Sequence, residues 1–424
     1  MAGFGQTRAV ELPAIVGHAA AHPDGEAAYS FDASAYKGDL KQLPIGVFDS
    51  GIGGLTVLEA ILSLDAFNND TLQPGGDGKR DFEDERFIYF GDQANMPYGN
   101  YPSSGKEDYL RELILKDAIF LLGKRAWPAN GGAPHFNKPP VKAIVIACNT
   151  ATAYGLEDIR AAIKAWNIPV IVVGVVEAGA RGVAESMIGR DKEAVAVLAT
   201  VGTCNANAYP KAINRSVGLA GKQVPAVVQQ GCVSLAGAIE GDPAFLLPLQ
   251  SAAQSVVSIV RKDVSSLVSR YHAAGGGPPI GRVVLGCTHF PLVQKEIAIA
   301  FAELRGSSPT NRDLIAETIE FVNPAELTAK ELFRSLASAR LRLKAAELSK
   351  LRHDEFFISI PNPMCPDVKL AENGALDATY KYGRAIGRFD VEDTKNVPME
   401  KSTLPKASVS LIQQKLPEVA SRLK

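Results

Sequence analysis

The sequence predicts an α/β protein with parallel sheets and a site built between two related halves. Short apolar runs rich in β-branched residues alternate with helical patterns along most of the chain, which is typical of parallel sheets covered by helices. Two of the runs end alike, AIVIACNTATA at 143–153 and RVVLGCTHFP at 282–291. Each places a cysteine, Cys148 or Cys287, just past the carboxyl end of a buried strand, and ligands bind at that edge of open α/β sheets.

The bulk composition is that of a globular protein and excludes several classes. A chain of 424 residues is long enough for two domains. A formal charge of −1 gives no reason to expect nucleic acid or an anionic membrane as a partner, and no stretch resembles a membrane span or a signal peptide. The five cysteines are an odd number without a CxxC pair, which favours free thiols in a reducing compartment over disulfides or a zinc ribbon. We therefore expect a cytoplasmic protein.

The globular part begins with a strand, a glycine turn and a helix. IGVFDS at 45–50 is a strand pattern, GIGG follows it, and LTVLEAILSL at 55–64 is a helix pattern. GIGG is either a tight turn or a loop whose backbone N–H groups face an anion such as a carboxylate. It lacks both the lysine of a Walker A loop and the last glycine of the dinucleotide fingerprint.

The next strand, at 86–90, ends in a long proline and glycine loop that can present Asn95, Tyr98 and backbone amides to a ligand. Glycine-rich surface insertions are expected near 67–85 and 124–140. Farther along, Thr200 and Thr203 follow a strand at 195–198.

The rest of the chain is predicted to hold a helix from about Leu246 to Tyr271, a short strand at 320–324, one long helix at 325–351, a strand within 353–366 and a terminal helix at 408–423. These patterns give an amino-terminal extension at 1–43, a first α/β domain of 44–173 plus 310–365, a second α/β domain of 174–309 and a carboxyl-terminal extension at 366–424.

Two thiols facing one cavity permit more than one chemistry. A lone nucleophilic cysteine needs a neighbouring base, and Cys287 has one in His289. Cysteines at equivalent places in two halves instead favour a symmetric reaction, in which one thiol takes a proton from a carbon and the other returns one to the opposite face of that carbon. Such stereoinversion needs polar groups that hold the substrate's ammonium and carboxylates, and the candidates are Ser50, Asn149, Thr150, Thr203 and Thr288.

The structural alternative stays open at this point. Any one buried cysteine is more often structural than catalytic, and that interpretation is kept for Cys204, Cys232 and Cys365. Asp49 is equally well a turn residue, and Glu240 a carboxylate at a helix end that faces water.

Four motifs then carry a family resemblance. IGVFDSGIGGLTVL, YFGDQANMPYG, IVIACNTATA and VVLGCTHFPLV, in this order, resemble the glutamate racemases of the aspartate/glutamate racemase superfamily. The resemblance implies two similar three-layer α/β/α domains with mainly parallel sheets and pseudo-twofold symmetry, an active site in the cleft between them, and no cofactor or metal. It implies interconversion of L- and D-glutamate, with D-glutamate supplied to peptidoglycan, and it leaves a homodimer open.

The same resemblance assigns roles to individual residues. It implies that Cys148 and Cys287 are the acid/base pair, that Asp49 assists the first thiol, and that His289 and Glu240 serve the second. The implied substrate-binding residues are Ser50, Pro97, Tyr98, Gly99, Asn149, Thr150, Thr203 and Thr288.

Some positions depart from the family's usual pattern. Ala199, Val233 and Asn323 stand where glycine, proline and aspartate are usual, and both extensions and both insertions are atypical. The alternatives are a racemase of aspartate or another amino acid, a noncatalytic ligand-binding relative, and a redox or metal role for Cys287 and His289, for which no further ligands have a recognisable spacing.

Overall fold

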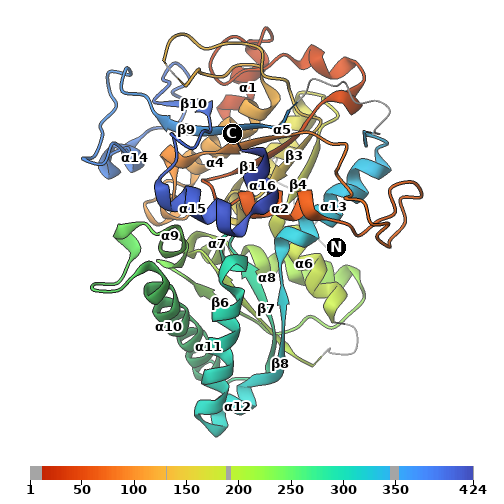
Figure 1. The fold of residues 1–424 in the computed structure, drawn as a ribbon, viewed down its shortest axis with the longest axis vertical. Helices are drawn as coiled ribbons and strands as arrows, with labels where there is room; N and C mark the ends of the chain where they lie inside the picture. Colours follow the sequence, from red (N-terminus) through yellow and green to blue (C-terminus); the bar gives the residue numbers. More distant parts are fainter. Residues whose placement is uncertain (1–11, 130, 188–191, 344–352, 424) are drawn as a thin grey trace, which may run out of the picture.

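The computed structural model describes residues 12–129, 131–187, 192–343 and 353–423, and they form two α/β units (Figure 1). The first unit contains a six-stranded sheet of order β10-β9-β2-β1-β3-β4, and the second a four-stranded sheet of order β6-β5-β7-β8. Every pairing is parallel except that of β10 with β9. The prediction of two α/β domains with mainly parallel sheets is therefore confirmed.

The strands are short and mostly buried. Those of the first sheet are β1 Ile45–Asp49, β2 Phe87–Gly91, β3 Ala143–Ile146, β4 Ile171–Gly174, β9 Glu355–Pro361 and β10 Thr394–Pro398. Those of the second are β5 Ala194–Ala199, β6 Val227–Gly231, β7 Ile280–Gly286 and β8 Ile315–Val322. All residues of β1, β2, β3, β5 and β7 are buried, because helices cover both faces of each sheet and leave no place for alternating polar residues.

Helices cover both faces of the first sheet, as the upper part of Figure 1 shows. One apolar cluster joins one face to α1 Ala14–Ala21, α4 Glu107–Leu122 and α5 Asn149–Ala165. The opposite face packs against α2 Leu55–Ser63, α13 Pro324–Ser338, α15 Lys406–Lys415 and α16 Pro417–Arg422. The short α3 Asn100–Ser103 and α14 Ala378–Gly383 lie outside these layers.

The second unit repeats the layering. Its sheet packs on one face against α6 Val175–Ser186 and α8 Ala208–Leu219, and on the other against α9 Leu235–Glu240, α10 Ala252–Ala273 and α11 Gln294–Ser307. The short α7 Val201–Asn205 and α12 Pro309–Leu314 complete it. One cluster of buried side chains runs without a break from the α2 and α13 side of the first sheet to the α6 and α8 side of the second. This shared core fixes how the two sheets sit relative to each other.

Several expectations about individual elements are wrong. The sequence assigns 310–365 to the first domain, but β8 pairs with β7, so the second domain extends through residue 322. The strand predicted at 320–324 covers the whole of Ile315–Val322 instead. The helix predicted from Leu246 begins only at Ala252, because Ser251 and Gln254 form a capping box there. The predicted long helix ends at Ser338, and its last residues, from 344 on, lie outside the described part, as do residues 1–11.

The described parts of the two extensions, 12–43 and 366–423, pack against the first unit. Ile15, Val16 and Ala19 of α1 are buried against α4 and α5. Beyond residue 366, β10 adds an antiparallel edge strand to the sheet, and two helices, α15 and α16, stand where one terminal helix is predicted. The extension that the sequence places at 366–424 therefore completes the first sheet.

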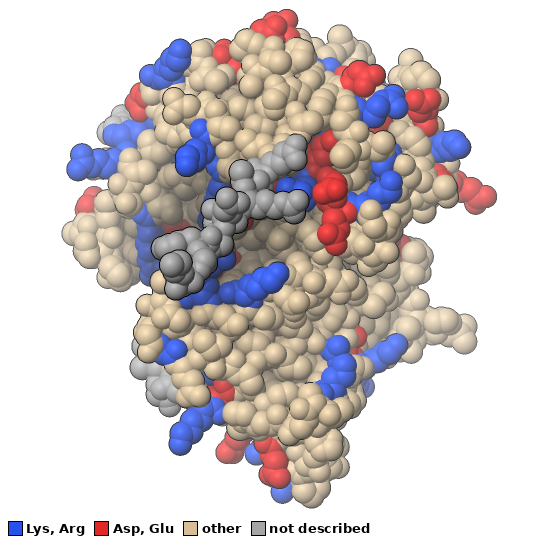
Figure 2. Space-filling model, turned by 180° about the vertical axis from the view of Figure 1, so that it is seen from behind, with Lys and Arg blue, Asp and Glu red and all other residues tan. Residues whose placement is uncertain are grey.

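Charged side chains of both signs lie on the surface of the protein. Lys and Arg side chains are interspersed with Asp and Glu over the face shown in Figure 2. No helix in the described ranges is both long and apolar enough to cross a lipid bilayer. All five cysteines are free thiols.

Candidate active site

The first thiol belongs to the junction between β3 and α5. Cys148 is the N-cap of α5, and its sulfur accepts a hydrogen bond from the Ala151 backbone N–H at 3.4 Å. The thiol in turn donates to Ser50 Oγ at 3.7 Å. The residue is only 6% exposed, and burial, together with the Asp49 carboxylate nearby, raises the pKa of the thiol well above its usual range. At neutral pH Cys148 is therefore a protonated thiol, although a helix amino end by itself favours the thiolate.

Asp49 ends β1 beside this thiol. Its carboxylate accepts a hydrogen bond from the backbone N–H of Gly54 at 2.9 Å, at the start of α2. Burial raises the pKa of this carboxyl, and the opposing effects of His289, of the hydrogen bond from Gly54 and of the neighbouring Cys148 thiol only partly offset that rise. The glycine loop thus does face an anion, and that anion is the protein's own Asp49. A carboxyl with a raised pKa is a better acceptor for a proton from a thiol than an ordinary aspartate.

The second thiol begins a chain of three residues. Cys287 follows β7, is 5% exposed, and its sulfur lies 3.7 Å from His289 Nδ1. His289 Nε2 lies 2.7 Å from Glu240 Oε1, at the end of α9. Burial lowers the pKa of His289, but its hydrogen bonds to Cys287 and Glu240 outweigh burial and hold that pKa well above its usual value. Both ring nitrogens are used within the protein.

The position of Glu240 decides between two interpretations of the sequence. Its carboxylate is buried and bonded to His289, so the interpretation as a helix-end carboxylate facing water is wrong. Thr288 lies beside the same ring, with Oγ1 3.4 Å from His289 Nδ1. Thr288 and His289 reach the same region because the backbone is not extended here: His289 has helical dihedrals and is the N-cap of a 3₁₀ turn.

Three close contacts join the two strand ends across the units. A β-carbon on Gly53 would lie 2.2 Å from Cε1 of His289, so the glycine turn touches the second thiol's histidine directly. Thr56 Oγ1 donates to the Thr288 carbonyl at 2.8 Å. Tyr209 of α8 donates its hydroxyl to Asn149 Oδ1 at 2.7 Å, and a charged Cys287 contributes to the raised pKa of this tyrosine, whose largest cause is burial. Both thiols therefore belong to one region, where the halves meet.

A cluster of three threonines lies beside the first thiol's helix. Thr150 Oγ1 is 3.0 Å from Thr200 Oγ1 and 3.3 Å from Thr203 Oγ1, and the last two are 2.9 Å apart. Thr150 comes from α5, Thr203 from α7, and Thr200 is the N-cap of α7, so the cluster joins the two units. Three hydroxyls at one point can reorient to accept from an ammonium or donate to a carboxylate.

The loop after β2 closes against this cluster. A β-carbon on Gly202 would lie 2.9 Å from the Cα of Gly99, so the backbones of loop and α7 are nearly in contact. Pro97 and Gly99 are partly exposed, whereas Tyr98 is buried and its hydroxyl lies 2.5 Å from Asp92 and 2.6 Å from Asp117. The phenol of Tyr98 is thus occupied inside the first unit, and any contact of Tyr98 with a substrate falls to its backbone.

Sequence reasoning missed Tyr209 and Thr56. Tyr209 lies in an ordinary helical pattern 60 residues from its partner Asn149, and Thr56 is 232 residues from the Thr288 carbonyl. No local periodicity or spacing marks either residue, so no sequence signal identifies them.

The site is closed. The cavity beside it has about 180 Å³ of empty space and is lined by Cys287, Thr288 and Asn149 among others, but not by Cys148. In the described stretches no group of three or more His, Cys, Asp or Glu side chains is arranged to hold a metal ion.

Each of the two α/β units thus brings a buried thiol to their junction, one beside a carboxylate and one beside an imidazole. The sequence matches the family model described as Asp/Glu/Hydantoin racemase over residues 123–310. A glutamate racemase of Thermus thermophilus is 30% identical over 298 residues, which cover 70% of this chain and 81% of the relative. One from a Parafrankia species is 32% identical over 299 residues, covering 69% and 78%.

A solved structure of a Bacillus anthracis glutamate racemase isoform is 25% identical, with a TM-score of 0.49, and covers 75% of this chain and 89% of its own. The sequence relatives show the family, since they are at least 30% identical over more than two thirds of this chain. The chain belongs to the glutamate racemase family.

Proposed function

We propose that the protein interconverts L- and D-glutamate by a two-base mechanism in which Cys148 and Cys287 act on opposite faces of the α carbon. The observation that carries the proposal is the pair of buried thiols at equivalent strand ends, each with its own titratable partner. The relatives named glutamate racemase support the choice of substrate. An aspartate or other amino-acid racemase is the alternative within this class.

Each turnover moves one proton off the substrate and another onto it. A thiolate forms an S–H bond as the Cα–H bond breaks, and the electron pair stays on the α carbon, delocalised toward the carboxylate. The opposite thiol then gives its proton to the other face and becomes a thiolate. Nothing is oxidised or reduced, so the reaction needs neither a redox partner nor a leaving group.

The two thiols have different electrostatic surroundings. Cys148 is a neutral thiol because of burial and the Asp49 charge. The raised pKa of His289 keeps its ring protonated at neutral pH, which puts a positive charge 3.7 Å from the Cys287 sulfur. Each turnover transfers the negative charge from one thiol to the other.

Polar groups around the thiols are suited to an amino acid with two carboxylates. We assign substrate binding to Ser50, Asn149, Thr150, Thr203 and Thr288, together with the Pro97–Gly99 backbone; Asn149 and Thr288 line the small cavity. We also propose that the product serves peptidoglycan synthesis in the cytoplasm, in keeping with five free thiols. A homodimer stays a hypothesis.

The test is racemisation in D₂O without added cofactor, followed by chiral chromatography and mass spectrometry. Starting from L-glutamate, we expect D-glutamate that carries one deuterium at the α carbon. Cys148→Ala and Cys287→Ala should each slow racemisation by at least about 10²- to 10⁴-fold, the usual contribution of one acid or base. Each variant should still exchange the α proton of the one enantiomer that faces its remaining thiol.

Cys365→Ala is the matched control: Cys365 is not one of the residues assigned to the site, so its replacement should leave the rate unchanged. If either Cys148→Ala or Cys287→Ala racemises at the parent rate, the two-thiol assignment is wrong. If no amino acid in a panel that includes aspartate loses its α proton, the protein is a noncatalytic relative.

A further inference from the structure

The carboxyl-terminal segment holds the loop to which substrate binding is assigned. Lys381 Nζ, in α14, donates to the Met96 carbonyl at 2.7 Å. Arg384, just after α14, donates from Nη2 to Asn95 Oδ1 at 2.6 Å. Asn95 and Met96 directly precede Pro97, so both bonds end on the residues that set where this loop begins. The segment lies outside the matched range 123–310 of the racemase family.

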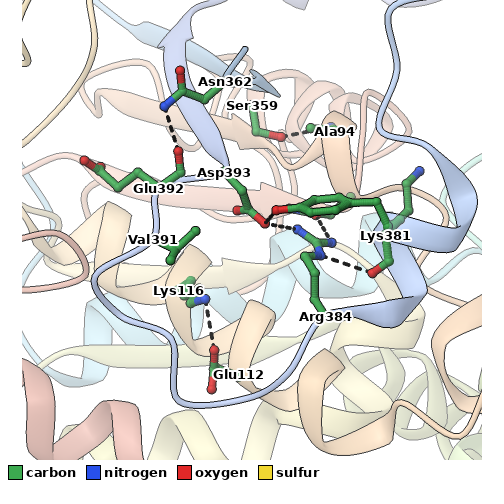
Figure 3. A network of polar contacts seen from close by, with 12 residues as sticks. Ala94, Glu112, Lys116, Ser359, Asn362, Lys381, Arg384, Val391, Glu392 and Asp393 are labelled. Atoms are coloured by element: carbon green, nitrogen blue, oxygen red, sulfur yellow. Dashed lines mark hydrogen bonds and ion pairs between the residues drawn. The ribbon is translucent and has the colours of Figure 1, made fainter. Parts of the chain in front are cut away.

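Arg384 is itself held in one orientation. Its side chain is only 7% exposed and is bonded through Nη1 to Asp393 at 2.7 Å, through Nε to the Lys381 carbonyl at 3.1 Å and through Nη2 to Tyr101 at 3.0 Å. The guanidinium also lies 4.8 Å from the ring centre of Tyr109. Figure 3 shows Arg384 between Asp393 and Lys381, with its carbonyl and carboxylate partners on either side. A planar guanidinium with every nitrogen engaged is a rigid anchor.

The inner side of the same loop is held by Asp92. Its carboxylate accepts from Asn95 Nδ2 at 2.9 Å and from Ser359 Oγ of β9 at 2.7 Å, and Ser359 Oγ accepts from the Ala94 N–H at 2.9 Å. Asn95 therefore has both ends of its amide fixed, Nδ2 by Asp92 and Oδ1 by Arg384. The inner bonds come from the first unit's own sheet, and the outer ones come from the extension.

The position of this loop sets the width of the site. Its Gly99 is almost in contact with Gly202 of α7, next to the threonine cluster. A shift of a few tenths of an ångström at Asn95 or Met96 therefore moves the wall that faces Thr150 and Thr203. Rates and affinities at such sites fall steeply with misplacement of about 1 Å.

We propose that Lys381 and Arg384 are positioning residues for amino-acid binding: the extension fixes the Asn95–Gly99 loop from outside and so sets the substrate's affinity. They do not contact the thiols, and their role is exercised through Asn95 and Met96. This inference rests on the proposed function for its substrate, while the contacts themselves are independent of it.

The experiment compares steady-state kinetics of Arg384→Ala, Arg384→Lys and Lys381→Met with those of the full-length parent, on glutamate in both directions. Arg384→Ala should raise KM and lower kcat/KM roughly 10- to 100-fold. Arg384→Lys should be intermediate, because an ammonium keeps the charge but cannot bridge Asn95 and Asp393 as the guanidinium does. Arg388→Ala is the matched control: Arg388 is in the same segment, 56% exposed, and pairs only loosely with Asp367 at 4.0 Å and Asp390 at 3.6 Å.

The readout separates positioning from a loss of folded protein. A variant that is merely unstable has fewer active molecules, so its apparent kcat falls while KM stays constant. A displaced loop raises KM in the molecules that are folded. Unchanged KM in Arg384→Ala and Lys381→Met, or changes no larger than those of Arg388→Ala, would overturn the proposal.

Two outcomes need a second variant or a second measurement. If Arg384→Ala does not fold, Lys381→Met decides, since it removes one hydrogen bond and keeps the apolar stem. If the parent racemises no amino acid, the proposed function has failed, and calorimetric titration of D-glutamate into parent and variants tests the positioning separately. Weaker binding in the Arg384 and Lys381 variants supports it, and equal binding contradicts it.

Discussion

Replacing Glu240 by glutamine tests whether a buried carboxylate sets the charge of His289. The substitution keeps the shape of the side chain but removes the negative charge 2.7 Å from Nε2. A hydrogen bond to a charged group contributes about 1.5–3 kcal/mol and a neutral one about 0.5–1.5 kcal/mol. The substitution should therefore weaken the interaction between residue 240 and His289 by about 1–2 kcal/mol, which corresponds to a roughly 5- to 30-fold loss in kcat/KM. Because both side chains are buried, this difference should persist at high salt.

The sign of the pH effect follows from the raised pKa of His289. Hydrogen bonds to Cys287 and Glu240 hold that pKa above its usual value against the effect of burial, so the folded protein keeps the imidazolium to higher pH than the unfolded chain does. The stability that this provides is full below the unfolded pKa and is lost as pH rises through the folded pKa. Glu240→Gln should therefore lower the pKa of His289, move the alkaline limb of the pH profile of kcat/KM toward lower pH, and reduce the stability gained on acidification.

The assay is kcat/KM from pH 6 to 10, with the free energy of unfolding measured by denaturant at the same pH values. Asp242→Asn is the control, because Asp242 is two residues away and caps a 3₁₀ turn through Ala244 N–H, a role that asparagine also fills. If Glu240→Gln keeps the parent's pH profile and a kcat/KM within about twofold, Glu240 does not set the charge of His289 and the reasoning fails.

Two further substitutions test the junction between the units. Gly53→Ala places a β-carbon 2.2 Å from His289 Cε1 and should lower kcat/KM about 100-fold in steady-state assays. Gly218→Ala in α8 is the control, because nothing lies within 4 Å of the new carbon and kcat/KM should not change. Equal rates for both variants would contradict the contact between Gly53 and His289. Tyr209→Phe leaves the buried Oδ1 of Asn149 without its donor and should cost about 1–3 kcal/mol in denaturant unfolding while raising KM; a loss below 0.5 kcal/mol, on the same order as an exposed substitution, would argue against that bond.

The parts of the fold that were predicted from sequence are those in which local pattern and burial agree. β1, β3 and β7 are mainly apolar because helices cover both of their faces; β1 ends at Asp49, and β3 and β7 end one or two residues before Cys148 and Cys287. Parallel strands bring their carboxyl ends to one edge of a sheet, so the pairing of β1 with β3 makes Asp49, at the end of β1, a neighbour of Cys148, just after β3. The sequence therefore predicted where the two thiols lie, but not which residues surround them.

The partners of those residues were harder to predict, because each depends on a contact between distant segments. Glu240 and His289 are 49 residues apart, and nothing in the pattern of α9 indicates which way its last carboxylate points. Only the family resemblance connected them. β8 was misplaced for a related reason: it is an edge strand with several exposed residues, so its sequence carries little of the apolar signal that marks a central strand.

The position of β10 in the first sheet determines which part of the site the carboxyl-terminal extension contacts. β10 joins the first sheet at β9, and β9 lies beside β2, whose carboxyl end leads into the Asn95–Gly99 loop. A segment added at this edge therefore meets that loop first, while β3 with Cys148 lies beyond β1 and Cys287 lies in the other unit. Because β10 pairs with only one strand, its sequence can stay polar. The loop residues that Lys381 and Arg384 contact are 285 and 289 residues away in the sequence. At this edge of the sheet, a carboxyl-terminal addition therefore reaches the substrate loop through Lys381 and Arg384.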